Sequence, residues 1–170
     1  MKSKTLVICG PSGVGKSTII KKLVEFFPDS FEFSISHTTR EPRKGEINGE
    51  SYHFIEKEEF THMKDEGEFI EFNQFAGNLY GTSAREIDRI LSKSKVCLLD
   101  VDINGVKAIY QSKYNLQPKY VFIACSDISE IESRLRKRGT EVEEKIKQRL
   151  YRIKDELAFL DSSEGFKRSN

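Results

Sequence analysis

Residues 10–17 form a glycine-rich stretch, G-P-S-G-V-G-K-S, whose spacing suits the binding of a triphosphate. It matches G-x-x-x-x-G-K-[ST] at every fixed position. Its glycines allow backbone conformations that turn amide N–H groups toward an anion, and a following helix adds its positive N-terminal end. Lys16 can reach the β- and γ-phosphates, and the Ser17 hydroxyl can coordinate Mg²⁺. The stretch therefore predicts ATP with Mg²⁺ as the first ligand. Its predicted binding residues are Gly10, Pro11, Ser12, Gly13, Val14, Gly15, Lys16, Ser17 and Thr18.

A second anion-binding pattern lies in the sequence S-H-T-T-R-E-P-R, where Arg40 and Arg43 flank a proline. An arginine fork binds phosphate bidentately and keeps its charge, although two arginines alone are also consistent with an ordinary basic surface pair. Tyr52 and Tyr80 supply hydroxyl groups that can donate to a phosphate. Glu71 can accept from the N1–H and 2-amino groups of a purine, two donors that only guanine presents together. The second ligand is therefore expected to be a guanine nucleotide.

Short apolar runs and helical patterns must position these residues. Continuously apolar runs, typical of parallel strands buried on both faces, occur at 5–9, 96–99 and 120–125. Helical patterns are expected at 17–27, 83–91 and 105–114. The glycine-rich stretch lies between the first strand and the first helix, which is the context that a phosphate loop requires. This alternation of strands and helices predicts an α/β fold.

Residues 31–82 have a different pattern. Phe31, Phe33 and Ile35 alternate with polar residues, as in a half-exposed strand. Further strands are expected at 51–55 and 69–75, with a short helix near 58–64. These features indicate a β-rich, antiparallel insert within the α/β frame.

The last third of the chain is helical in pattern. One helix is expected at 128–137, before Gly139, and a second begins at Thr140 with Glu143 three residues later, as in a capping box. Apolar residues recur through this second helix at spacings of three and four, which indicates packing on the core.

The composition limits the classes of function. The chain has 170 residues, of which 32% are charged, with a net charge of +1, so it is expected to hold one domain with a small insert and not to be a general nucleic-acid binder. No apolar run approaches the roughly 20 residues of a membrane span, and no signal-peptide pattern opens the chain. Cys9, Cys97 and Cys125 all lie in apolar runs and are predicted to be buried thiols. A reducing, cytoplasmic setting is therefore expected.

The sequence closely resembles the guanylate kinase family from about residue 5 to about residue 160. The matching stretches, in the family's order, are GPSGVGKST, FSISHTTREPRKGEINGESYHF, FIEFNQFAGNLYGTS, LLDVDINGVK and RLRKRGTE, followed by the spacing to Arg149. The resemblance implies the three-layer α/β fold of P-loop nucleoside monophosphate kinases, with a parallel core sheet, a GMP-binding insert and a helical lid. It implies a core at 1–34 and 84–126, the insert at 35–83, the lid at 127–150, and a return helix with the C-terminus at 151–170.

The resemblance also implies roles for individual residues. The GMP phosphate would be held by Arg40, Arg43, Tyr52 and Tyr80. The guanine would be bound by Ser36, Glu71 and Thr82, where Thr82 replaces the serine of some members and keeps the hydroxyl. Gly81 and Asp102 would complete the GMP site, and Asp100 would join Ser17 in ordering Mg²⁺ through water. Asp100 and Asp102 are also consistent with ordinary carboxylates at a strand end, although the edge beside a phosphate loop favours a functional role.

The implied activity is reversible, Mg²⁺-dependent phosphoryl transfer from ATP to GMP or dGMP, giving ADP and GDP in purine nucleotide metabolism. Arg138 and Arg149 match two lid arginines that fold over the transferring group, and Arg134 matches a further basic position. The GMP phosphate is already an anionic nucleophile, so no protein base is required, and the three histidines are expected to be bystanders. The expected catalytic residues are Lys16, Arg43, Arg138 and Arg149. The chain is expected to act as a monomer on ATP and GMP, without nucleic-acid or membrane partners.

One departure from the family pattern leaves alternatives open. Family members usually continue further, with a strand, a loop near the adenine and a closing helix, so this chain is expected to lack the final strand and helix. One alternative is a catalytically inactive, guanylate-kinase-like binding module or truncated isoform. Another is a kinase for a different nucleotide or a phosphorylated sugar. The intact phosphate loop with both Arg40 and Arg43 favours an enzyme, and Ser36, Glu71 and Thr82 together favour guanine.

Overall fold

The computed structural model describes residues 4–11, 13–75, 77–114, 116–124 and 127–137, together with residues 143, 146, 147, 150, 151 and 153. The described strands form two four-stranded sheets, with the orders β2-β7-β1-β8 and β4-β3-β6-β5. In the first sheet every pairing is parallel. Its strands are β2 (Phe31–Phe33), β7 (Val96–Val101), β1 (Thr5–Cys9) and β8 (Lys119–Phe122).

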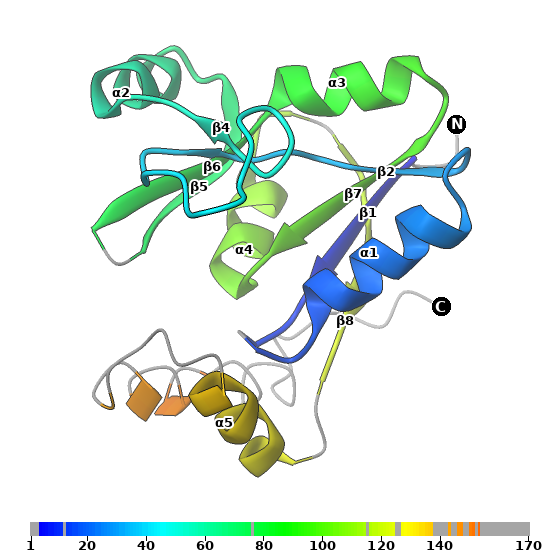
Figure 1. Ribbon diagram of the computed structural model, residues 1–170. Coiled ribbons are helices and arrows are strands. Elements are labelled where there is room, and N and C mark those ends of the chain that lie inside the picture. The colour runs from blue at the N-terminus through cyan, green and yellow to red at the C-terminus, as the bar shows by residue number, and fades with distance from the viewer. Residues whose placement is uncertain are drawn as a thin grey trace.

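The parallel sheet is the middle of three layers (Figure 1). Because successive residues of a strand point to opposite faces, Val7 and Cys9 pack with Ile87 of α3 (Ala84–Ser92) and Val106 of α4 (Ile103–Gln111). On the other face, Ile8 and Leu98 pack against Ile20 of α1 (Lys16–Phe26). Both faces of the sheet are therefore covered, and the predicted α/β fold with a parallel core sheet is confirmed.

The second sheet is mixed. β5 (Phe69–Phe75) and β3 (His37–Thr38) are antiparallel to β6 (Asn78–Ser83), whereas β4 (His53–Phe54) runs parallel to β3. The prediction of an antiparallel insert is therefore wrong for β4. Helix α2 (Lys57–Asp65) packs on this sheet through the fully buried Phe60, whose ring stacks on that of Phe69 at a centroid distance of 4.4 Å.

Two short crossings connect the sheets. Residues 34–36 join β2 to β3, and β6 runs directly into α3. The alternating segment that begins at Phe31 thus supplies a strand of the parallel sheet, not of the second sheet, because its backbone pairs with β7. At the other end of the core, Ile131 of α5 (Ile128–Lys137) packs with Val14 of the glycine-rich stretch.

Several predicted elements lie where the sequence placed them. β1, β5 and α5 have the predicted bounds, and the other strands and helices predicted before residue 138 differ by a few residues at their ends. The helix predicted to begin at Thr140 lies largely outside the described residues. Cys9 and Cys97 are buried thiols outside any disulfide, as predicted, and Cys125 lies outside the described residues. Among the helices in the described ranges, none has the length and apolar character needed to cross a membrane.

Candidate active site

The glycine-rich stretch links β1 to α1. Gly10 has φ +141°, and a Cβ atom there would lie 2.3 Å from the carbonyl oxygen of Ile123, so only glycine fits between the loop and the segment after β8. Gly15, with φ +111°, is the N-cap of α1 and offers no side chain to the first-turn amides. These amides therefore point from the helix N-terminus without a side-chain cap, as an anion site requires. Ser12 lies outside the described residues, and Val14 is buried against α5.

Lys16 folds back over this loop. Its Nζ atom donates to the carbonyl oxygens of Gly10, at 2.7 Å, and Pro11, at 3.2 Å. The same ammonium lies 3.8 Å from Asp100 Oδ1 at the carboxyl end of β7. The parallel register, in which Ile8 pairs with Asp100, explains why the two side chains meet at this edge of the sheet. The positive charge of Lys16 is thus held at the mouth of the phosphate loop.

Ser17 and Asp100 line one groove of about 420 Å³ between α1 and the parallel sheet. Burial and the neighbouring Asp102 raise the pKa of Asp100, and Lys16 opposes this shift. A hydroxyl and a carboxylate are hard oxygen donors, so the pair fits Mg²⁺ held together with substrate phosphates and water. Within the described residues no group of three or more His, Cys, Asp or Glu side chains forms a metal cage.

Asp102 caps α4. Its Oδ1 atom accepts a 2.9 Å hydrogen bond from the backbone N–H of Gly105. Gly105 lies close to Glu71, since a Cβ atom at Gly105 would be 3.3 Å from Glu71 Oε2. The first turn of α4 therefore places Asp102, which follows β7 of the core, near Glu71 of the second sheet.

Glu71 and Thr82 form a buried polar pair on the second sheet. They face each other across β5 and β6, and Glu71 is 6% and Thr82 2% exposed. The Thr82 hydroxyl donates to Glu71 Oε1 at 2.6 Å. Burial raises the pKa of Glu71 to about 7, with a contribution from Asp102, while the hydrogen bonds from Thr82 act in the opposite direction. A carboxyl group this deeply buried next to one hydroxyl is suited to hydrogen-bond donors on a ligand.

The side chains of Arg40, Tyr52 and Tyr80 form a second cluster on this sheet. The Arg40 guanidinium carbon lies 5.4 Å from the centre of the Tyr52 ring, and the rings of Tyr52 and Tyr80 meet edge to face at 6.1 Å. Burial and Tyr80 raise the pKa of Tyr52, Arg40 lowers it, and the charge of Asp100 raises it further. Asp100 therefore pairs with the Lys16 ammonium and also raises the pKa of Tyr52 in this cluster.

Glu46, which was not among the residues predicted from the sequence, holds the Arg40 side chain and the Arg43 backbone. Its Oε1 atom accepts from Arg40 Nη2 at 2.9 Å, and its Oε2 atom accepts from the backbone N–H of Arg43 at 2.7 Å. These hydrogen bonds hold the pKa of Glu46 below its ordinary value. The Arg43 side chain is exposed, and no ion pair holds its guanidinium within the described part of the chain. A carboxylate three residues after the second arginine was the available sequence signal.

The remaining predicted residues are only partly described. Ser36 is half-buried in the first crossing, where its carbonyl oxygen accepts from the His53 N–H at 2.9 Å. Gly81 is buried in β6, where a Cβ atom would lie 2.9 Å from the Phe69 ring. Thr18 is exposed in the first turn of α1. Arg134 belongs to α5, and Arg138 and Arg149 lie outside the described residues.

Comparisons with known proteins agree on one family. A family model described as guanylate kinase matches residues 2–166. The guanylate kinase of Schizosaccharomyces pombe is 45% identical over 166 residues, which cover 98% of this chain and 81% of that protein. The guanylate kinase of Sus scrofa is 44% identical over 154 residues, covering 91% and 77% respectively. The chain spans only 40% of guanylate kinase 1 of Oryza sativa subsp. japonica, at 44% identity.

A solved structure is similar in fold. The crystal structure of guanylate kinase from Anaplasma phagocytophilum matches with a TM-score of 0.61 and 29% sequence identity. The match covers 91% of this chain and 84% of the other. Sequence and structure therefore point to the same family over nearly the whole chain.

Proposed function

This chain belongs to the guanylate kinase family, and we propose that it transfers the γ-phosphoryl group of ATP to GMP, or to dGMP, giving ADP and GDP. The observation that carries the proposal is the buried pair of Glu71 and Thr82. Within the described part of the chain, Thr82 is the one side chain that donates to the Glu71 carboxyl group, which can therefore also accept from a base. The pair lies on the second sheet, and Asp102 and Gly105 connect it with the core that carries the phosphate loop.

Glu71 supplies the choice of base. An ionised carboxylate accepts from guanine N1–H and from the 2-amino group, whereas adenine presents neither donor at those positions. A nucleotide that leaves a buried carboxylate without donors loses affinity strongly. Thr82 and Ser36, which lie in or beside the crossings, are proposed to add hydrogen bonds to guanine.

Arg40, Arg43, Tyr52 and Tyr80 are proposed to hold the GMP phosphate. Guanidinium groups bind phosphate oxygens bidentately and keep their charge at all accessible pH values. The position of Arg40 beside Glu46 and over Tyr52 supports this role, because its donors are oriented before any phosphate binds.

The phosphate loop and Lys16 are proposed to bind ATP. Backbone N–H groups within this loop are proposed to bind the phosphates, and the Lys16 ammonium is near enough to exchange its loop carbonyl partners for phosphate oxygens. Ser17 and Asp100 are the residues that would hold Mg²⁺, Asp100 through water. When bound with ATP, Mg²⁺ neutralises charge on the β- and γ-phosphates.

In the transfer step a GMP phosphate oxygen forms a bond to the γ-phosphorus while the bond from that phosphorus to the ADP oxygen breaks. The attacking oxygen is already anionic, so no residue has to remove a proton. Lys16 and Arg43 are proposed to stabilise the charge of the transferring group, with Arg138 and Arg149 contributing from outside the described residues. Exclusion of water from the closed site favours GMP over hydrolysis.

The setting belongs to the same proposal. We expect a monomer that acts on two small molecules, without nucleic-acid or membrane partners, in a reducing compartment such as the cytoplasm. The buried thiols of Cys9 and Cys97, which form no disulfide, support the reducing setting.

The test is ADP formation from ATP and Mg²⁺ with GMP, dGMP, AMP, CMP or UMP as the acceptor. Turnover with GMP and dGMP alone is the expected result. A folded protein that binds GMP in calorimetry without turnover would identify a binding module instead. Turnover with another acceptor would contradict the assignment of Glu71 to guanine recognition.

A further inference from the structure

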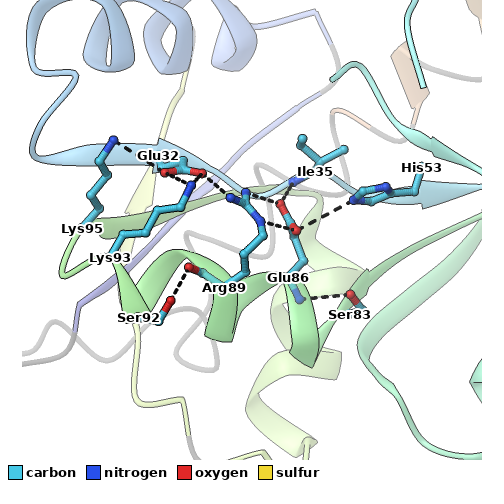
Figure 2. A network of polar contacts seen from close by, with 9 residues as sticks. All are labelled: Glu32, Ile35, His53, Ser83, Glu86, Arg89, Ser92, Lys93 and Lys95. Carbon is cyan, nitrogen blue, oxygen red and sulfur yellow. Dashed lines mark hydrogen bonds and ion pairs between the residues drawn. The ribbon is translucent and has the colours of Figure 1, made fainter. Parts of the chain in front are cut away.

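Glu86 is a buried carboxylate at the junction of the two sheets. It lies in the first turn of α3, directly after the crossing from β6, and is 5% exposed. Its backbone N–H donates to the hydroxyl of Ser83, the N-cap of the helix, at 3.3 Å. Its side chain reaches the other crossing, where Oε1 accepts from the backbone N–H of Ile35 at 3.2 Å (Figure 2). One residue therefore contacts both connections between the sheets.

Ile35 is the residue at which the backbone changes partner. The N–H of Ser34, one residue earlier, donates to Leu98 in the parallel sheet at 2.9 Å. The carbonyl of Ser36, one residue later, accepts from His53 in the second sheet at 2.9 Å. Between them, the Ile35 N–H is bonded to the Glu86 side chain. The crossing is thus held at its midpoint by the Glu86 side chain. Removing that side chain would leave the backbone hydrogen bonds of both sheets intact.

Arg89 fixes the Glu86 carboxylate in this position. Its Nε donates to Oε2 at 2.9 Å and its Nη2 to Oε1 at 2.8 Å, while its Nη1 donates to Glu32 of β2 at 2.6 Å (Figure 2). Glu32 also pairs with Lys93 and Lys95, and His53 Nε2 lies 3.8 Å from Glu86 Oε2. Burial alone would raise the pKa of Glu86, but the hydrogen bonds from Arg89 and Ile35 hold it below the ordinary value. The group stays ionised and oriented.

The contacts of Glu86 adjoin two residues proposed to bind guanine. Ile35 precedes Ser36, and Ser83 follows Thr82. We propose that Glu86, oriented by Arg89, is a positioning residue that holds the Ser36 and Thr82 segments at a fixed separation and so preorganises the GMP site. This inference rests on the proposed function. Glu86 touches no substrate itself, and it acts through the backbone of the two crossings.

The test compares Glu86→Ala, Glu86→Gln and Arg89→Gln with the matched control Glu58→Ala, which removes an exposed glutamate of α2. We expect Glu86→Ala to raise KM for GMP by about tenfold, since it removes a charged hydrogen bond to the crossing between β2 and β3. KM for ATP should change by less than about twofold, because the phosphate loop is not bonded to Glu86. Glu86→Gln keeps an acceptor for Ile35 and should restore part of the loss. Calorimetry with GMP alone should reproduce the order of the variants.

Arg89→Gln keeps the Glu86 side chain but removes the guanidinium that orients its carboxylate, so it carries the test if Glu86→Ala does not fold; about a threefold rise in KM for GMP is expected. The inference fails if folded Glu86→Ala and Arg89→Gln have the GMP affinity and KM of the unmodified protein, or if KM for ATP and GMP rise equally. An unmodified protein that does not phosphorylate GMP would contradict the proposed function instead. In that case GMP affinity alone decides whether Glu86 positions the site.

Discussion

The hydroxyl of Thr82 donates a 2.6 Å hydrogen bond to Glu71 across β5 and β6, where both side chains are buried. Burial raises the pKa of Glu71 to about 7, so this hydrogen bond does not compensate for the loss of water. At neutral pH the carboxyl group is divided between its acidic and ionised forms. Only the ionised form offers both oxygens as acceptors, so the proposed recognition of guanine should depend on pH.

The first prediction concerns the pH dependence of GMP binding. Between about pH 6 and about pH 8 the ionised fraction of Glu71 rises about tenfold, so KM for GMP should fall by a similar factor. KM should be measured at saturating ATP. The GMP phosphate has its own ionisation near pH 6. The variant Glu71→Gln retains that contribution and lacks the carboxyl group, so its pH dependence should be flatter. Equal slopes in the two proteins would contradict the prediction.

The second prediction concerns the stability of Glu71→Gln. The pKa of Glu71 is raised from 4.5 to about 7 by folding, so the ionised group destabilises the fold. Its effect is absent below about pH 4.5, grows as the pH rises toward about 7, and is complete above that. The glutamine keeps an acceptor for Thr82 and carries no charge. Denaturant unfolding should show a gain of up to about 3 kcal/mol at about pH 8 and little gain at about pH 4.5. A gain of the same size at both pH values would exclude ionisation as its cause.

The third prediction separates orientation from charge at Glu46. Glu46→Ala removes the acceptor that holds Arg40 and the Arg43 N–H, and should raise KM for GMP by about fivefold or more. Glu46→Gln keeps one of the two acceptors and removes a negative charge from beside the proposed phosphate site, so its KM for GMP should rise less than that of Glu46→Ala. Initial rates at saturating ATP distinguish the two. If both variants change KM in the same direction and by the same factor, Glu46 does not act by orienting the arginines.

The fourth prediction concerns Lys16. Replacement by methionine keeps most of the side-chain volume and removes the ammonium that lies over the phosphate loop. We expect kcat to fall by about 10²-fold or more, because a preorganised donor to the transferring group is lost. GMP affinity in calorimetry should remain within about twofold, since the Glu71 and Arg40 clusters are untouched. A variant with normal kcat would show that the ammonium does not serve the transfer.

The predictions from sequence succeeded where the information is local. β1, β5 and α5 were placed at their observed residues because short apolar runs, helical periodicity and a terminal glycine report on neighbouring residues. β3 was not predicted, since this two-residue strand exists through its pairing with the distant β6, and β6 was also missed although it pairs with the adjacent β5. The parallel course of β4 likewise depends on where the chain returns after the loop at 39–52.

The sequence alone determined the phosphate loop and the chemical types in the proposed GMP site, because a backbone turn and a side-chain functional group are covalent properties of a few residues. The tertiary structure decided how these groups meet. An irregularity in β5 between Phe69 and Glu71 brings Glu71 opposite Thr82, and the resulting burial sets its pKa. The same holds for Glu86, whose role follows from reaching Ile35, 51 residues away in the chain. Such contacts depend on the packing of whole sheets, and no local spacing in the sequence specifies them.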